Sequence, residues 1–202
     1  IILISKCGKK RNVALPYLRE LVTFEGTPMH VVFAEFGSIY AEAGQYDSAD
    51  YYFDKALQLS REYEDPEIEQ AVTWELAKKY AILGDTASAI EKCVETIEIG
   101  STPFYCIFYY RAKYFLIQYH LSRGNLRKVD EVMRKYDFGE CETIDPPERV
   151  DMHVLLAQYY KAVKNTEAAF EHLDIANKIL AQHDSAMAGR EATRRQMASD
   201  YG

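Results

Sequence analysis

The sequence contains few of the residues and motifs on which catalytic and metal sites depend. Its 202 residues include four cysteines, five histidines and one tryptophan. No HExxH motif, GxSxG motif or glycine-rich phosphate loop occurs. The cysteines also lack CxxC and zinc-finger spacings. We therefore expect no enzyme activity, no cofactor and no bound metal.

The four cysteines are Cys7, Cys93, Cys106 and Cys141. A chain of this length buries enough apolar surface to fold without disulfides. We therefore expect free thiols, which favour a reducing compartment and hence the cytoplasm, although four cysteines also allow two bridges. Cys93 and Cys106 are expected to be inert core residues, and Cys141 to be exposed.

Basic stripes and long apolar runs are also missing. The formal net charge is −7, and nucleic-acid affinity depends mainly on lysine and arginine neutralising phosphates. The most apolar stretch, residues 104–121, is interrupted by Arg111 and Lys113 and falls short of the roughly 20 apolar residues of a membrane span. The sequence thus predicts neither nucleic acid nor membrane as a partner. It opens without methionine, which favours a piece of a larger protein.

What the sequence does contain is a repeat with a period of 40 residues. The turn positions that define it are Gly44, Gly84, Gly124 and Lys164. The residue four before each turn is a ring, and the residues there are Tyr40, Tyr80, His120 and Tyr160. The residue five after each turn is small, and the residues there are Ala49, Ala89, Val129 and Ala169. Each unit is therefore predicted to be two helices that meet closely across a short turn, where glycine adopts the left-handed conformation.

The starts of the first helices support this division. Each start pairs a capping side chain with a proline, whose missing N–H costs nothing in the first turn. The pairs are Thr27-Pro28, Asp65-Pro66, Thr102-Pro103 and Asp145-Pro146. An exception is Pro16, which predicts a kink or a late start in a helix over about residues 11–24.

These offsets resemble the tetratricopeptide repeat. The first unit carries the fullest match, with Phe36-Gly37, Tyr40, Gly44, Tyr46, Ala49, Phe53 and Ala56. The resemblance covers roughly residues 28–181 and implies an all-α fold, a right-handed superhelix of stacked helical hairpins. The period of 40 exceeds the 34 most common in the family and is similar to that of many bacterial regulatory and sensor proteins.

We expect one solenoid over residues 1–202. It would comprise a partial repeat over 1–26, repeats over about 28–64, 66–101, 103–144 and 146–181, and a C-terminal helix over 184–200. That helix either caps the solenoid, as its end requires, or connects it to a following effector domain.

The first helices of such repeats line a concave wall. Helical periodicity places the residues 13, 10, 6 and 3 before each turn on one face, which we call the inward stripe. It consists of Val31, Ala34, Ser38, Ala41, Ala71, Trp74, Lys78, Ala81, Arg111, Tyr114, Gln118, Leu121, Asp151, Val154, Gln158 and Lys161. From this stripe we predict partner-binding roles for Ser38, Trp74, Lys78, Arg111, Tyr114, Gln118 and Gln158. Aromatic residues and arginine anchor recognition surfaces, although Trp74 and Tyr114 equally suit packing between helices.

Two functions fit this reading. One is a protein- or peptide-binding scaffold that uses the concave groove. The other is a sensory or regulatory domain of a multidomain bacterial signalling protein, such as a histidine kinase, a diguanylate cyclase or a transcription regulator, with its output domain after residue 202. Exposed end faces also allow a homo-oligomer. His120 and His153 are expected to be packed, hydrogen-bonded core residues and not ligands.

Overall fold

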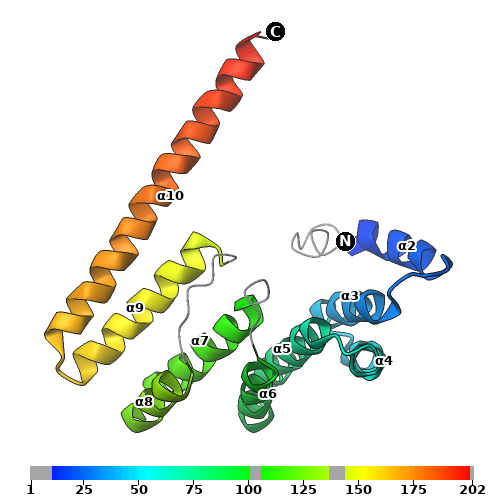
Figure 1. The fold of residues 1–202 in the computed structure, drawn as a ribbon, viewed down its shortest axis with the longest axis horizontal. Helices are drawn as coiled ribbons and strands as arrows, with labels where there is room; N and C mark the ends of the chain where they lie inside the picture. Colours follow the sequence, from blue (N-terminus) through cyan, green and yellow to red (C-terminus); the bar gives the residue numbers. More distant parts are fainter. Residues whose placement is uncertain (1–10, 101–105, 137–143, 201–202) are drawn as a thin grey trace. The chain divides into compact units, whose positions relative to one another are not determined.

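The protein is described from a computed structural model, which covers residues 11–100, 106–136 and 144–200 (Figure 1). The helices in these ranges are α2 (Arg11–Leu21), α3 (Met29–Glu42), α4 (Tyr46–Glu62), α5 (Pro66–Ile82), α6 (Thr86–Glu98), α7 (Cys106–Ser122), α8 (Leu126–Lys135), α9 (Pro146–Ala162) and α10 (Thr166–Asp200). No strand occurs in these ranges. The predicted all-α fold is confirmed, whereas the superhelix stays a prediction.

The chain divides into two compact units, residues 1–113 and 114–202. The boundary falls inside α7, in the third of the predicted repeats. The expectation of one continuous array over both units stays a prediction.

In the first unit, consecutive helices pack as hairpins. α3 packs on α4 and α5 on α6, and the second hairpin joins the first because α5 contacts both α3 and α4. The core between them contains Ala49, Phe53 and Ala56, each with no exposed surface, together with Val72 and Leu76. Ala49 and its equivalent Ala89 are fully buried, as the close approach of paired helices requires.

The four turn positions all adopt the predicted left-handed backbone. The φ angles are 71° at Gly44, 78° at Gly84, 69° at Gly124 and 62° at Lys164. Lysine adopts this region at a cost that glycine avoids. The shared conformation shows that the turn, and not the residue type, is what recurs every 40 residues.

The predicted helix caps hold at one of the three starts that the structure describes. The Asp65 carboxylate accepts hydrogen bonds from the backbone N–H groups of Glu67 and Ile68 at 3.1 and 3.2 Å. The Thr27 hydroxyl instead donates to the carbonyls of Leu21 and Phe24, and Asp145 makes no side-chain cap. At α3 the N-cap residue is Pro28, whose side chain cannot accept a hydrogen bond, so Thr27 stands one residue too early to cap the helix. Thr102-Pro103 lies outside the described residues.

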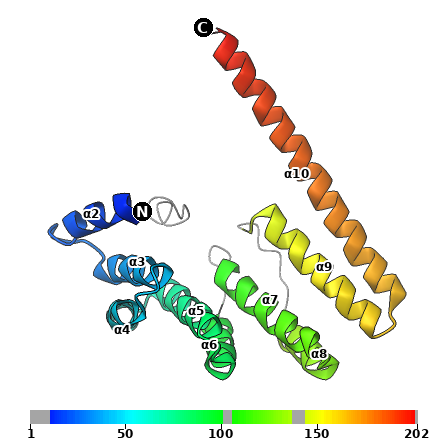
Figure 2. The same cartoon turned by 180° about the vertical axis from the view of Figure 1, so that it is seen from behind.

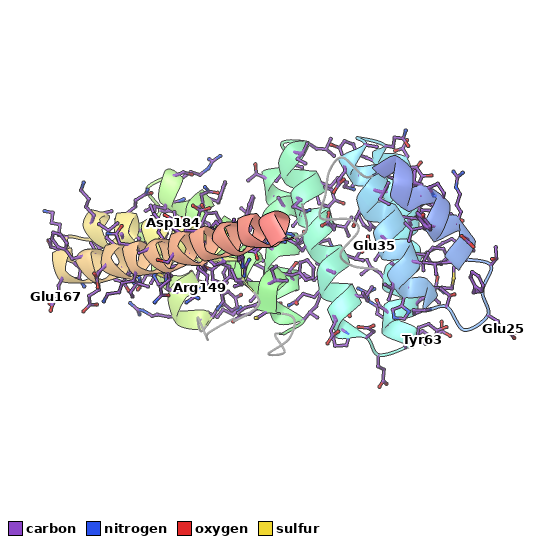
Figure 3. All side chains as sticks on the ribbon, turned by 90° about the horizontal axis from the view of Figure 1, so that it is seen from above. Glu25, Glu35, Tyr63, Arg149, Glu167 and Asp184 are labelled. Atoms are coloured by element: carbon purple, nitrogen blue, oxygen red, sulfur yellow. The ribbon has the colours of Figure 1, made fainter. Side chains whose placement is uncertain are left out.

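In the second unit, α10 packs along α9, as Figures 1 and 2 show from opposite sides. α10 has 35 residues and α9 has 17, so the later part of α10 continues past its partner. Glu167 and Asp184, labelled in Figure 3, lie in its first turn and near its middle. The separate helix expected over 184–200 is therefore the continuation of the last repeat's second helix.

One expectation about the cysteines is wrong. Cys106 is disulfide-bonded, whereas Cys93 is a free, buried thiol as expected. Cys7 and Cys141 lie outside the described residues. Sequence spacing misses such a bond because the fold, and not the separation along the chain, decides which sulfurs meet. In the described ranges, every helix is too short or too polar to cross a membrane.

Candidate functional site

A groove of about 300 Å³ opens between α7 and α9 in the second unit. Its lining comprises Tyr114, Gln118, Leu121, Ser122, Asp151, Val154, Leu155 and Gln158. All of these except Ser122 and Leu155 belong to the inward stripe predicted from the repeat. The two helices hold equivalent places in successive repeats, so the same register turns the same face of each toward the groove.

The helical register explains why these side chains face the groove. On α7, Tyr114, Gln118 and Leu121 follow at intervals of four and three residues, which places them on one face. On its other side, α7 contacts the core through Leu116 and Ile117, which are 1% and 0% exposed. α7 therefore buries one side and leaves the groove side available.

The groove combines polar rims with an apolar lining. Gln118 and Gln158 are exposed, and the Gln118 amide donates a long hydrogen bond of 3.5 Å to the Tyr114 hydroxyl. Leu155 is buried and Val154 is half-buried, and both line the groove together with the two amides. Such a lining can hold an aliphatic side chain while the amides bond a polar backbone.

Of the described residues that line the groove, Asp151 is the one with an acidic or basic side chain. It is exposed, and its negative charge acts on Tyr114. Burial first, and then Asp151, raise the pKa of the Tyr114 hydroxyl, because both oppose a phenolate. Tyr114 thus remains a neutral hydroxyl beside an anion.

The remaining predicted site residues belong to the first unit. Trp74 is 8% exposed, so its ring is almost entirely covered within the chain, which matches the packing alternative. Lys78 is partly exposed and forms an ion pair of 2.7 Å with Glu75 of the same helix. Ser38 and Arg111 are half-buried. The predicted surface therefore divides between two units, and only Tyr114, Gln118 and Gln158 lie around one groove.

The first unit also holds a carboxyl that the inward stripe did not include. Glu35 projects from α3 (Figure 3), and Glu75 occupies the equivalent place on α5, nine residues before the next turn. Burial and the nearby charge of Glu75 raise the pKa of Glu35 to about 7. The two carboxyls stand one period apart in the sequence, but spacing does not reveal the burial that raises the pKa of Glu35.

Two of the histidines form a pair that the sequence did not predict. The Nδ1 atoms of His153 on α9 and His172 on α10 lie 2.9 Å apart, and the His172 ring stacks on Tyr160. Burial lowers the pKa of both histidines. The buried Nδ1 atom of His120 has no hydrogen-bond partner in the described part of the chain, so its predicted hydrogen bonding fails at that atom. No set of three or more metal-ligating side chains occurs in the described part of the chain.

Sequence reasoning missed five lining residues as site residues: Asp151, Leu121 and Val154, which lie on the inward stripe, and Ser122 and Leu155, which do not. Asp151 was on the inward stripe, and the signal that would have selected it is charge, because it is the one acidic residue there. Leu155 and Ser122 lie next to stripe positions. They reach the groove because a helix presents a broad face, and a stripe of four positions describes only its centre.

Comparison with known proteins gives the fold and nothing further. No protein-family model matches the chain, and no curated protein matches it. Among solved structures, the crystal structure of BtubC (BKLC) from P. vanneervenii is similar, with a TM-score of 0.58 and 17% sequence identity. The match covers 88% of this chain and 75% of that one. At this identity, the likeness shows that the chain shares an all-α fold with that protein.

Proposed function

We propose that this protein is a non-catalytic scaffold that holds a segment of another protein in the groove between α7 and α9. The single observation that carries this proposal is the groove itself, which gathers the stripe residues of two successive repeats. The resemblance to tetratricopeptide repeats supports it, since the concave wall is the surface that the resemblance implies for binding.

The lining favours an extended segment as the ligand. Gln118 and Gln158 each offer an amide that both donates and accepts hydrogen bonds, which suits the backbone of an extended chain. Tyr114 offers a ring and a hydroxyl at low cost in conformational entropy. Leu121, Val154 and Leu155 provide the apolar contacts that such a complex needs.

The test is a selection of displayed random peptides on the whole chain, followed by affinity measurements on the selected peptides. The double variant Gln118→Ala/Gln158→Ala is expected to weaken binding at least tenfold, a loss of about 1.4 kcal/mol. Lys178→Ala is the matched control, since Lys178 is exposed on α10 away from the groove. Peptides that bind the double variant as tightly as the wild type would disprove the groove as the site.

The variant Trp74→Ala separates the groove from the wider predicted surface. Trp74 is nearly buried, so its truncation is expected to lower stability and to leave peptide affinity unchanged once the protein is folded. A specific loss of affinity in folded Trp74→Ala would instead extend the binding surface into the first unit and support the sequence-based prediction for Ser38, Lys78 and Arg111.

The second candidate is a regulatory domain of a larger signalling protein, and the length of α10 favours it. A helix that continues past α9 suits a connector better than a cap, because residues 184–190 are exposed in place of covering the last hairpin. The test is the coding sequence after residue 202. A kinase, cyclase or DNA-binding domain there would support this candidate, and an immediate stop codon would refute it.

We also propose that the protein is cytoplasmic and that its exposed end faces allow a homo-oligomer. Disulfides are rare in reducing compartments, so the bond at Cys106 makes the location testable. Alkylation of intact cells before lysis, followed by peptide mapping, is expected to find Cys106 as a thiol if the protein is cytoplasmic. Complete oxidation in the cell would place the protein in an oxidising compartment.

A further inference from the structure

The groove carries one unneutralised charge. Asp151 is exposed, and no described residue forms an ion pair or hydrogen bond with it. Among the residues that the structure describes, no lysine, arginine or histidine lines the groove. Asp151 is therefore open to a cationic group of a ligand, which it attracts by its negative charge.

An aromatic ring accompanies this carboxylate. Tyr114 lines the same groove from α7, and burial first and then the charge of Asp151 raise the pKa of its hydroxyl. A cation that approaches a carboxylate beside an aromatic ring gains both an ion pair and a cation–π contact. The carboxylate and the ring therefore form a site that favours a positively charged group of the ligand over a negatively charged one.

We propose that the groove selects an extended protein segment with a lysine or arginine, whose cationic group lies between Asp151 and the Tyr114 ring. This inference rests on the proposed function and adds the chemistry of the partner. The amides of Gln118 and Gln158 bond the backbone on either side, and the aliphatic lining receives a neighbouring apolar side chain. The net charge of −7 on the whole chain further favours the approach of basic segments.

The sign of the preference distinguishes this groove from one that grips an acidic tail. A segment with an aspartate, glutamate or terminal carboxylate at the same place would face Asp151, and the described lining offers no lysine or arginine to neutralise it. Like charges brought together in this way oppose binding. The groove is therefore expected to discriminate against acidic segments and not merely to tolerate basic ones.

The experiment uses a peptide selected on the whole chain and synthesised in three forms, with lysine, glutamine or glutamate at one position scanned along its length. Fluorescence polarisation gives the three affinities. At the matching position, the lysine form is expected to bind about tenfold more tightly than the glutamine form, and the glutamate form more weakly than either. The lysine preference should fall as salt rises.

Variants of Asp151 test whether this side chain sets the preference. Asp151→Asn should abolish the difference between the lysine and glutamine forms, and Asp151→Lys should reverse the order so that the glutamate form binds best. Asp145→Asn is the matched control. It makes the same change at an exposed carboxylate six residues earlier, at the start of α9 and outside the groove lining, and should leave the preference intact.

The outcomes separate this inference from the function on which it rests. If no selected peptide depends on Gln118 and Gln158, the proposed function fails. If peptides depend on the amides but bind equally well with lysine, glutamine or glutamate at every position, only the present inference fails. A preference that survives unchanged in Asp151→Asn would also overturn it. Circular dichroism confirms that each variant is folded, so a loss of binding is not a loss of structure.

Discussion

The change Gly37→Ala tests how closely α3 and α4 approach each other. Gly37 is buried on α3, and a Cβ atom added there would lie 2.4 Å from both Cδ1 and Cε1 of Phe53 on α4. Carbon atoms in contact normally stand about 3.5–4.0 Å apart, so the ring or the helix must move by about 1 Å. Phe53 has no exposed surface and packs in the core between the two hairpins, which leaves it no free direction.

The expected cost follows from two opposing effects. Overpacking of a core typically costs about 1–3 kcal/mol, and replacing glycine by alanine inside a helix returns about 1 kcal/mol. Gly37→Ala should therefore lower the free energy of unfolding by up to about 2 kcal/mol. Gly189→Ala is the matched control, since a Cβ atom on Gly189 in α10 has no neighbour within 4 Å, so only the helix gain remains.

Urea denaturation followed by circular dichroism measures both variants. Adding Phe53→Leu to the wild type and to Gly37→Ala completes a double-mutant cycle. The smaller side chain should remove most of the cost of Gly37→Ala. If Gly37→Ala is as stable as the wild type, or gains stability as Gly189→Ala should, the close approach of α3 and α4 is not a constraint on this fold.

Three further predictions concern protonation. Because the pKa values of His153 and His172 are lowered in the folded protein, the unfolded chain binds protons at a higher pH than the folded one. The free energy of unfolding should therefore fall as pH drops below about 6.5. His153→Gln/His172→Gln should flatten this slope in urea titrations, and an unchanged slope would contradict the burial that lowers both pKa values. Glu35 has its pKa raised to about 7, so the wild type should lose stability as pH rises from about 4.5 to 7. Glu35→Gln should avoid that loss and gain at most about 3 kcal/mol at about pH 8; no gain there would contradict the burial of Glu35. Burial raises the pKa of Cys93 to about 12, so iodoacetamide should spare Cys93 in the native protein at about pH 8 and label it in urea. Rapid labelling without urea would place this thiol at the surface.

Local geometry was predictable because it depends on residues close in sequence. The turns recur every 40 residues, and each has a left-handed residue at the predicted place, including Lys164. The small residues after the turns are buried as expected, with Ala49, Ala89 and Val129 fully covered. Helical periodicity also selected most of the residues around the groove, because a face is a local property of a helix.

Contacts between residues far apart in the sequence were not predictable. Whether Trp74 faces a partner or packs inside depends on which helix lies against it, and the sequence left both open. The disulfide at Cys106, the hydrogen-bonded pair of His153 and His172, and the raised pKa of Glu35 all arise from groups that folding brings together. Sequence alone thus determined the helices, their turns and the face that each presents. Tertiary structure decided which faces meet, because packing, burial and electrostatics act through space and not along the chain.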